Sequence, residues 1–340
     1  MKKIFLQLSL ILSVVFGGLT MVAKADNLNY SVAAELPENQ VNSDVSYFDL
    51  KVNPGQTQTL TIKIKNKDSQ AHTYAVSPNR ASTNSNGVID YSQPRAKADA
   101  SLKFDIKTAL SKVQKVEVPA KSTKAVTIKL AIPKTAFTGI ALGGINVTQE
   151  NTATAKKSSG MTIENQYAYV IGLQVREATS TSIKPNMKLL GIKAKQINYQ
   201  NYVTANLQND QPVIMHGLKI KSYVTAANST KKLLTTNKEN MAMAPNSNFN
   251  FAIGDGKQPL KAGKYTLHLT ATADKGKHKW QFTRNFTISQ QKADSLNKTA
   301  VGQVQQRNYF WWFVGLGVII VALLGLVIWL LLKNRRHNQA

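Results

Sequence analysis

The sequence predicts an all-β protein, with two tandem immunoglobulin-like β-sandwich domains plus one C-terminal transmembrane helix. Between positions 48 and 288, short segments alternate apolar with polar residues, and this period of two is typical of half-buried strands. Turn residues separate the segments, and no comparable amphipathic helix pattern lies between them. Residues 309–332 form one long uncharged run, which predicts the membrane helix.

The N-terminal segment, residues 1–25, has the three parts of a secretory signal peptide. Two lysines follow Met1, an apolar run extends from Ile4 to Leu19, and Ala23-Lys24-Ala25 is a small-x-small cleavage site. An uncleaved membrane anchor is the alternative, but polar residues interrupt the apolar run, which is short for a stable span. We therefore expect cleavage after Ala25.

The C-terminal run from Tyr309 to Leu332 contains no charged residue. A helix over it would be about 36 Å long at 1.5 Å per residue, which is enough to cross a bilayer with some tilt. Aromatic residues mark both of its ends, and three basic residues follow in the tail, residues 333–340. The positive-inside rule then places the tail in the cytoplasm. The expected location is the cell membrane, in a single pass, with the N-terminal ectodomain outside.

The charge of the chain is strongly positive, with a formal net charge of +25. Six of the basic residues lie in the signal segment and the tail, which contain no acid, so the exported part retains +19. Such a charge favours polyanionic partners through long-range attraction. Secretion argues against nucleic acid, whereas peptidoglycan with anionic wall polymers offers the same kind of field. The chain has no cysteine, so its domains must fold on core packing alone.

The organisation of the ectodomain follows from its strand patterns. In residues 59–66, apolar Leu60, Ile62 and Ile64 alternate with threonine and lysine, as in a strand with one core face and one wet, basic face. The run from Tyr167 to Val175 either ends one sheet or bridges to the next. The predicted segments are a first β-sandwich at 26–150, a connecting strand and hinge at 151–182, a second β-sandwich at 183–290, and a polar stalk at 291–308. An extended stalk over residues 290–308 would reach about 60 Å, and a helical one about half of that.

The sequence gives little sign of catalysis or of metal binding. The five histidines are scattered, the 18 acidic residues are dispersed, and no nucleophile stands in a recognisable motif. We expect no catalytic residue, no cofactor and no metal site. Seven residues are candidates for contact with a partner or the wall, although lysines of this kind are usually a solvated face and the others usually serve turns or close packing; they are Lys63, Lys65, Lys67, Gly139, Gly143, Gly144 and Asn246.

The order of several short motifs resembles that of the WxL-interacting proteins, cell-surface proteins of Gram-positive bacteria. The motifs of the first half are Phe48 to Gln56, Thr59 to Asn66, and the segment IPKTAFTGIALGGI from Ile132 to Ile145. Those of the second half are Leu207 to Asn209, Met243 to Phe249, Leu260 to Tyr265, Trp280, and Phe286 to Ile288. No single motif is specific, but their order together with both membrane signals is.

The resemblance implies a peptidoglycan-binding first domain and a second domain that engages host or extracellular-matrix proteins, with WxL-domain proteins as bacterial partners. On this basis we expect a non-enzymatic scaffold at the cell surface that supports adhesion. Two alternatives stay open. One is a membrane-tethered chaperone or assembly factor that adds a sheet edge to partner strands. The other is a wall-modifying enzyme, because carboxylates can meet in space from distant positions.

Overall fold

The structure is a computed structural model that describes residues 29–150, 167–180, 182–301 and 310–337. Within the last of these ranges, the side chains of residues 310–313, 327, 328 and 330–337 are outside the description. The expected signal peptide, residues 1–25, lies outside the described residues, as do the last three residues of the expected tail.

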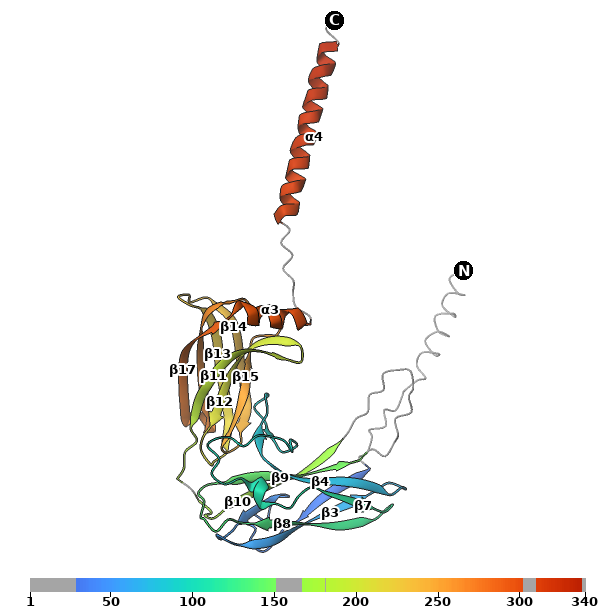
Figure 1. The fold of residues 1–340 in the computed structure, drawn as a ribbon, viewed down its shortest axis with the longest axis vertical. Helices are drawn as coiled ribbons and strands as arrows, with labels where there is room; N and C mark the ends of the chain where they lie inside the picture. The colour runs from blue at the N-terminus through green and yellow to red at the C-terminus, as the bar shows by residue number, and fades with distance from the viewer. Residues whose placement is uncertain (1–28, 151–166, 181, 302–309, 338–340) are drawn as a thin grey trace, which may run out of the picture.

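The first unit consists of two sheets (Figure 1). The three-stranded sheet has the order β1 (Tyr30–Glu35), β3 (Thr57–Asn66), β8 (Thr123–Ala131). The five-stranded sheet has the order β2 (Phe48–Lys51), β10 (Ala168–Arg176), β9 (Ala141–Gln149), β4 (His72–Arg80), β7 (Gln114–Val118). All pairs are antiparallel except the parallel pair of β2 with β10.

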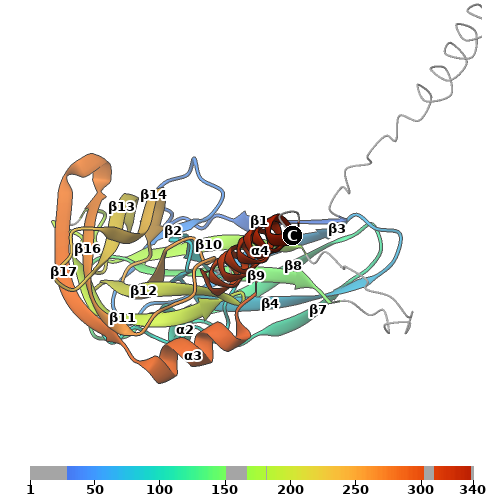
Figure 2. The same ribbon diagram turned by 90° about the horizontal axis from the view of Figure 1, so that it is seen from above.

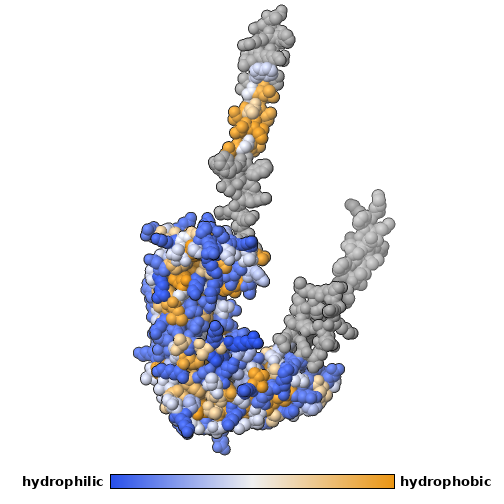
Figure 3. Space-filling model, in the orientation of Figure 1, coloured by the Kyte–Doolittle hydropathy of each residue, from blue (hydrophilic) through white to orange (hydrophobic). Residues whose placement is uncertain are grey.

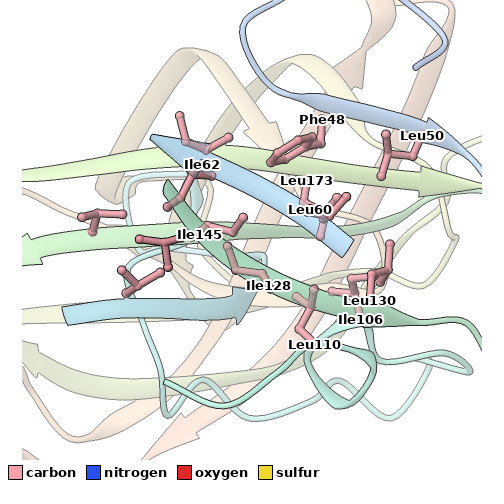
Figure 4. Close-up of a cluster of buried hydrophobic side chains, with 14 of the residues drawn as sticks. Phe48, Leu50, Leu60, Ile62, Ile106, Leu110, Ile128, Leu130, Ile145 and Leu173 are labelled. Atoms are coloured by element: carbon pink, nitrogen blue, oxygen red, sulfur yellow. The ribbon is translucent and has the colours of Figure 1, made fainter. Parts of the chain in front are cut away.

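The core of the first unit lies between these two sheets (Figure 4). Leu60, Ile62 and Ile64 of β3 are buried, whereas Lys63 and Lys65 between and after them are exposed, as the alternation predicts. The five-stranded sheet adds buried side chains from all five of its strands, among them Phe48, Tyr74, Val118, Ile145 and Leu173. Because burial of a large apolar side chain contributes about 1.5–3 kcal/mol, this cluster holds the cysteine-free unit together.

The sequence left open whether residues 167–175 end one sheet or bridge to the next, and the pairing of strand β10 decides between the two. It pairs antiparallel with β9, with Ile171 opposite Ile145, and parallel with β2, with Leu173 opposite Phe48. Leu173 and Val175 are fully buried in the first core. The strand therefore ends the first unit and does not bridge to the second.

The second unit also has two sheets around one core. Its three-stranded sheet has the order β11 (Met187–Ile197), β12 (Gln200–Asn209), β15 (Ser247–Ile253). Its four-stranded sheet has the order β14 (Lys232–Met243), β13 (Met215–Ala226), β16 (Gly263–Ala273), β17 (His278–Ile288), and the short helix η1 (Asp274–Gly276) joins the last two strands. Phe249 and Phe251 are buried, and Trp280 packs against the core while partly exposed.

The segment between β4 and β7 lies in the angle between the two units (Figures 1 and 2). It forms the small hairpin of β5 (Ser82–Thr83) with β6 (Ile89–Asp90), and then the one-turn helix α2 (Ile106–Ala109). Asp105 caps α2 by accepting a hydrogen bond from the backbone N–H of Lys107, as short polar side chains do at helix starts.

Part of the expected stalk is helical and packed. Helix α3 (Gln290–Thr299) begins at the cap Ser289, and its side chains Ala293 and Leu296 are buried in the second core. Asn297 of α3 exchanges two hydrogen bonds with the backbone of Leu260, at 2.8 and 2.9 Å. The expected stalk was a polar segment without core contacts, and residues 291–299 differ from it. Ala293 and Leu296 are three positions apart, so they share one face of α3 and pack together against the core.

The last helix, α4 (Phe310–His337), extends away from both units (Figure 1). Its described middle part is a hydrophobic column in the space-filling view (Figure 3), where apolar side chains from Val314 to Leu326 are exposed. Judged by length and hydropathy over the residues that the structure describes, no helix meets the requirements for crossing a membrane.

Candidate functional site at the junction of the two units

The three candidate lysines lie on the outer face of the three-stranded sheet of the first unit or directly after it. Lys63 and Lys65 are exposed on β3, and Lys67 follows the end of the strand. Lys63 pairs with Glu35 of β1, while Lys129 of β8 lies on the same face, one strand away. The face is wet and basic as predicted, with exposed threonines between its lysines.

Gly139 and Asn246, which no sequence pattern connects, both lie at the junction of the two units. The backbone of Gly139 has a φ of +77°, and a Cβ atom there would come within 2.3 Å of the carbonyl oxygen of Pro212. The next residue, Ile140, donates its N–H to the same oxygen at 2.7 Å. A side chain at position 139 would therefore push the second unit away from the first.

Asn246 fixes the β14–β15 turn against the first unit. Its side-chain amide donates to the carbonyl oxygen of Ser101 at 3.0 Å, to the Ser101 hydroxyl at 3.1 Å, and to the carbonyl oxygen of Asp210 at 3.0 Å. Its φ is +46°, a conformation that asparagine tolerates better than most residues. Asn246 is thus a turn residue, as expected, and a contact between units as well.

Gly143 and Gly144 are packing residues of β9. A Cβ atom at Gly143 would lie 2.6 Å from the carbonyl oxygen of Asn79, and one at Gly144 would lie 2.9 Å from the ring of Tyr91. The expectation of a close-packing site, where a missing Cβ lets another backbone approach, is confirmed for Gly143.

The hairpin of the first unit joins the second unit through buried hydrogen bonds. The hydroxyls of Thr83 and Ser247 lie 2.6 Å apart, and Thr83 Oγ1 also accepts from the N–H of Ala244 at 3.0 Å. Beside them, Ala242 donates its N–H to the carbonyl oxygen of Gly87 at 2.8 Å. Buried polar groups that lose a partner cost about 1–3 kcal/mol each, so these contacts hold the two units in one relative position.

Asp99 is the buried charge of the junction, with only 8% of its surface exposed. Its carboxylate accepts hydrogen bonds from Gln208 at 2.7 Å, from Asn248, and from the N–H and hydroxyl of Ser101 at 2.9 and 2.7 Å. Burial alone would raise the pKa of Asp99, but the hydrogen bonds from Asn248, Ser101 and Gln208 outweigh burial and lower the pKa from its ordinary value of 3.8. The ionised carboxylate thereby links the loop of the first unit to two strands of the second.

Two adjoining hollows lie beside these contacts. A cavity of about 400 Å³ is lined by Arg80, Asp105 and Asn246, and a larger one of about 860 Å³ is lined by Phe104, Phe137 and again Asn246. They share Phe104, Asp105, Ile140 and Asn246 as lining residues, so together they form one groove, which we call the junction groove. Both units contribute to its walls.

The junction groove combines charge with aromatic surface. Arg80 Nη2 and Asp105 Oδ2 pair at 2.7 Å with side chains 16% and 17% exposed, and Arg80 Nε is buried without a hydrogen-bond partner among the described residues. The rings of Phe104 and Phe137 lie 4.7 Å apart. Such a mixture of apolar faces and a few fixed polar groups is typical of binding sites. No cluster of three potential metal ligands occurs in the described part of the chain.

The sequence did not indicate Arg80, Asp99, Phe104 or Asp105 as site residues. Arg80 ends β4, and the other three lie in a stretch without strand periodicity. The partners of Asp99 in the second unit, Gln208 and Asn248, are more than a hundred residues further along the chain. The only local signals are Asp-x-Ser turns such as Asp99–Ser101, in which a carboxylate binds the N–H two residues on. Those signals predict a loop and not a groove.

The fold and the groove define a class: an all-β protein of two two-sheet units that share one groove at their junction. Sequence profiles identify the family. The peptidoglycan-binding domain of WxL-interacting proteins matches residues 30–149, and the host-binding domain of WxL-interacting proteins matches residues 158–298. The chain belongs to the WxL-interacting protein family. The second match includes β10, which the structure places in the first unit.

Other comparisons add less. No curated protein matches the chain significantly. Among solved structures, a chaperone–tip adhesin complex of CFA/I fimbriae biogenesis is 10% identical, covering 76% of this chain and 98% of that one, with a TM-score of 0.29. The Pseudomonas aeruginosa CupB2 chaperone is 11% identical, covering 68% of this chain and 93% of that one, with a TM-score of 0.26. The E. coli chaperone DraB is 14% identical, covering 71% of this chain and 94% of that one, with a TM-score of 0.25. TM-scores this low do not establish a common fold.

Proposed function

We propose that this chain is a non-enzymatic, membrane-anchored cell-surface protein that binds peptidoglycan or anionic wall polymer and WxL-domain proteins, and that supports adhesion to host or matrix proteins. The junction groove carries the proposal. It is built jointly by units that match a peptidoglycan-binding and a host-binding domain, and buried hydrogen bonds hold it in shape. We assign the WxL-domain partner to this groove.

We further propose that both units are immunoglobulin-like sandwiches. The strand order supports this. The three-stranded sheet takes β1, β3 and β8 in the first unit and β11, β12 and β15 in the second. In each unit the strand that follows the second of these, β4 or β13, lies in the other sheet with the last two strands, which is a Greek-key arrangement. In the first unit an early strand also pairs in parallel with the last one.

Anchoring rests on the uncharged run of residues 309–332 and its flanking basic residues. Exposure of apolar side chains from Val314 to Leu326 on α4 supports it, because an apolar helix surface in water has no compensating contact. The signal segment 1–25 supports export, and together these two segments support a location of both units outside the membrane.

We assign binding of the cell wall to the basic outer face of the first unit. Lys65 and Lys129 are exposed there, with threonine hydroxyls available to sugars beside them. Only Lys63 on this face has an acidic partner in the described residues, Glu35. Attraction to an anionic polymer would be screened by salt, since the Debye length falls to about 8 Å at physiological ionic strength.

The test uses the full-length protein in detergent. Phe137→Ala, which removes one of the paired rings of the groove, is expected to reduce capture of WxL-domain proteins encoded by neighbouring genes, with wall binding unchanged. Phe286→Ala is the matched control, because Phe286 is also partly buried and its ring lies 5.6 Å from that of Tyr265, outside the groove. Equal capture by both variants would refute the assignment to the groove. Failure of the unmodified protein to capture either wall material or WxL-domain proteins would refute the function.

The second candidate is a chaperone that adds its sheet edge to strands of a partner protein during export. The long edge strand β14 favours this function, because β14 pairs only with β13 among the described residues. Its two lysines and the register shifts of that pair work against strand addition. Crosslinking from β14 distinguishes the two functions. A chaperone would be found on partners in transit and be absent from mature complexes, whereas a scaffold stays with them. Release of soluble sugar or peptide from purified wall would instead indicate an enzyme.

A further inference from the structure

The second unit has two ends with different surroundings. One end, with Pro212 and Asn246, contacts the first unit. The opposite end, which we call the distal end, is formed by residues 198–199, 227–233, 254–264 and 289–301, and α3 lies across it (Figure 1).

The distal end is basic. Its lysines are all exposed, and its only acids are Asp255 and Asp294. With seven lysines against two aspartates, the distal end has a net charge of +5; the lysines are Lys231, Lys232, Lys257, Lys261, Lys264, Lys292 and Lys298. Within the described part of the chain, the side chains of Lys231, Lys257 and Lys261 form no ion pair.

Apolar side chains stand among these lysines. Tyr199 is 67% exposed, Leu233 is 47% exposed and Val301 is 65% exposed. Leu233 lies at the rim of a cavity of about 470 Å³ that Leu260 and Tyr265 also line. Exposed aromatic and aliphatic groups surrounded by lysines are the composition of surfaces that rest in a membrane interface.

The chain leaves the second unit at the distal end. The N–H of Val301 donates to the carbonyl oxygen of Tyr199 at 2.9 Å, which fixes the chain to this end just beyond α3. Only eight residues, 302–309, separate this point from Phe310, the first residue of α4, and eight residues reach at most about 30 Å. If α4 is the anchor, as the proposed function holds, the distal end cannot move far from the membrane.

We propose that the distal end docks on a bilayer surface that contains anionic phospholipids. Its lysines face the headgroups, while Tyr199, Leu233 and Val301 enter the interface. Because the junction groove lies at the other end of the second unit, docking turns the groove and the basic face of the first unit away from the membrane and toward the wall. The inference rests on the proposed anchoring by α4.

The experiment uses the full chain reconstituted in vesicles. The protein has no cysteine, so Thr230→Cys provides a single site for a fluorophore at the distal end. Acrylamide in the water phase quenches the fluorophore, and this quenching is expected to be about threefold weaker in vesicles of phosphatidylglycerol with phosphatidylcholine than in vesicles of phosphatidylcholine alone. At high salt the quenching in the anionic vesicles should recover. Lys277→Cys, at the opposite end of the second unit, should show equal quenching in both vesicles.

Charge variants then identify the surface. Lys231→Glu, Lys257→Glu and Lys261→Glu together should abolish the difference between the two vesicle types. The matched control changes Lys275, Lys277 and Lys279 to Glu, which alters the net charge equally at the other end and should leave the difference intact. Equal quenching in both vesicle types, or equal loss in both triple variants, would overturn the docking surface. A full chain that does not float with neutral vesicles would instead overturn the anchoring itself, so the two failures are distinguishable.

Discussion

Asp99 shows how one residue couples two units that are far apart in sequence. Asp99→Asn replaces a carboxylate that accepts four hydrogen bonds with an amide that presents a donor to the amide groups of Gln208 and Asn248. We expect a loss of about 1–3 kcal/mol in the free energy of unfolding, measured by denaturant titration. Asp255→Asn should change stability by much less, because Asp255 lies in an exposed loop where, among the described residues, its carboxylate accepts only from the N–H of Lys257.

The same carboxylate predicts a pH dependence. The pKa of Asp99 is lowered in the folded protein, and so is the pKa of Asp210. Burial raises the pKa of Asp210, but its contacts with Lys188, Gln211 and Asn186 lower the pKa by more. A lowered folded pKa stabilises the protein above the unfolded value of 3.8, and this stabilisation is lost as the pH falls through the folded pKa. The melting temperature should therefore stay level near neutrality and fall below about pH 4. Asp99→Asn should flatten this fall, and an unchanged profile would contradict the assignment.

Gly139 offers a second test at the residue scale. Gly139→Ala places a Cβ atom 2.3 Å from a backbone oxygen of Pro212 and forces alanine to a φ of +77°. We expect a loss of about 2 kcal/mol in the free energy of unfolding and a looser junction, visible as faster hydrogen exchange at Ile140. Gly191→Ala on β11 is the matched control, because a Cβ there meets nothing within 4 Å; equal losses would show that the junction contact is unimportant.

At the scale of elements, α3 is the feature that changes the connection between the second unit and α4. Leu296→Ala removes a buried side chain of α3 from the second core. We expect a loss of about 2–3 kcal/mol and release of α3 from the unit, detected as new protease cleavage between residues 290 and 301. Ser295→Ala, an exposed neighbour on the same helix, should leave the cleavage pattern unchanged.

At the scale of the whole molecule, the two basic surfaces and the junction groove lie in different places. The basic face of the first unit and the distal end of the second lie on opposite sides of the junction groove (Figure 1), so the proposed contacts with wall and membrane are compatible with each other. Lys65→Gln with Lys129→Gln should weaken binding of purified anionic wall polymer about threefold at low salt and less at high salt. Changing Lys275 and Lys277 to Gln is the control. Equal weakening by both pairs would mean that net charge alone attracts the polymer.

The sequence by itself determined the all-β architecture and most strands, because the alternation of apolar with polar residues reports which face of a strand is buried. It indicated the buried set Leu60, Ile62 and Ile64 and the exposed Lys63 and Lys65. The order of short motifs also indicated the family that the profiles then matched. The strand pattern is a local signal that can be found within a few residues of chain, whereas the family signal depends on the order of motifs along the chain.

Only the tertiary structure decided the groove and the place of α3. Asp99 meets Gln208 and Asn248, and Gly139 meets Pro212, across separations that no local pattern encodes. The pair Ala293 and Leu296 is too short a signal to distinguish a packed helix from a polar stalk until the second core is present to receive it. The physical reason is the same in both cases: a contact between units depends on where two folded cores come to lie, and periodicity within one segment contains no information about that position.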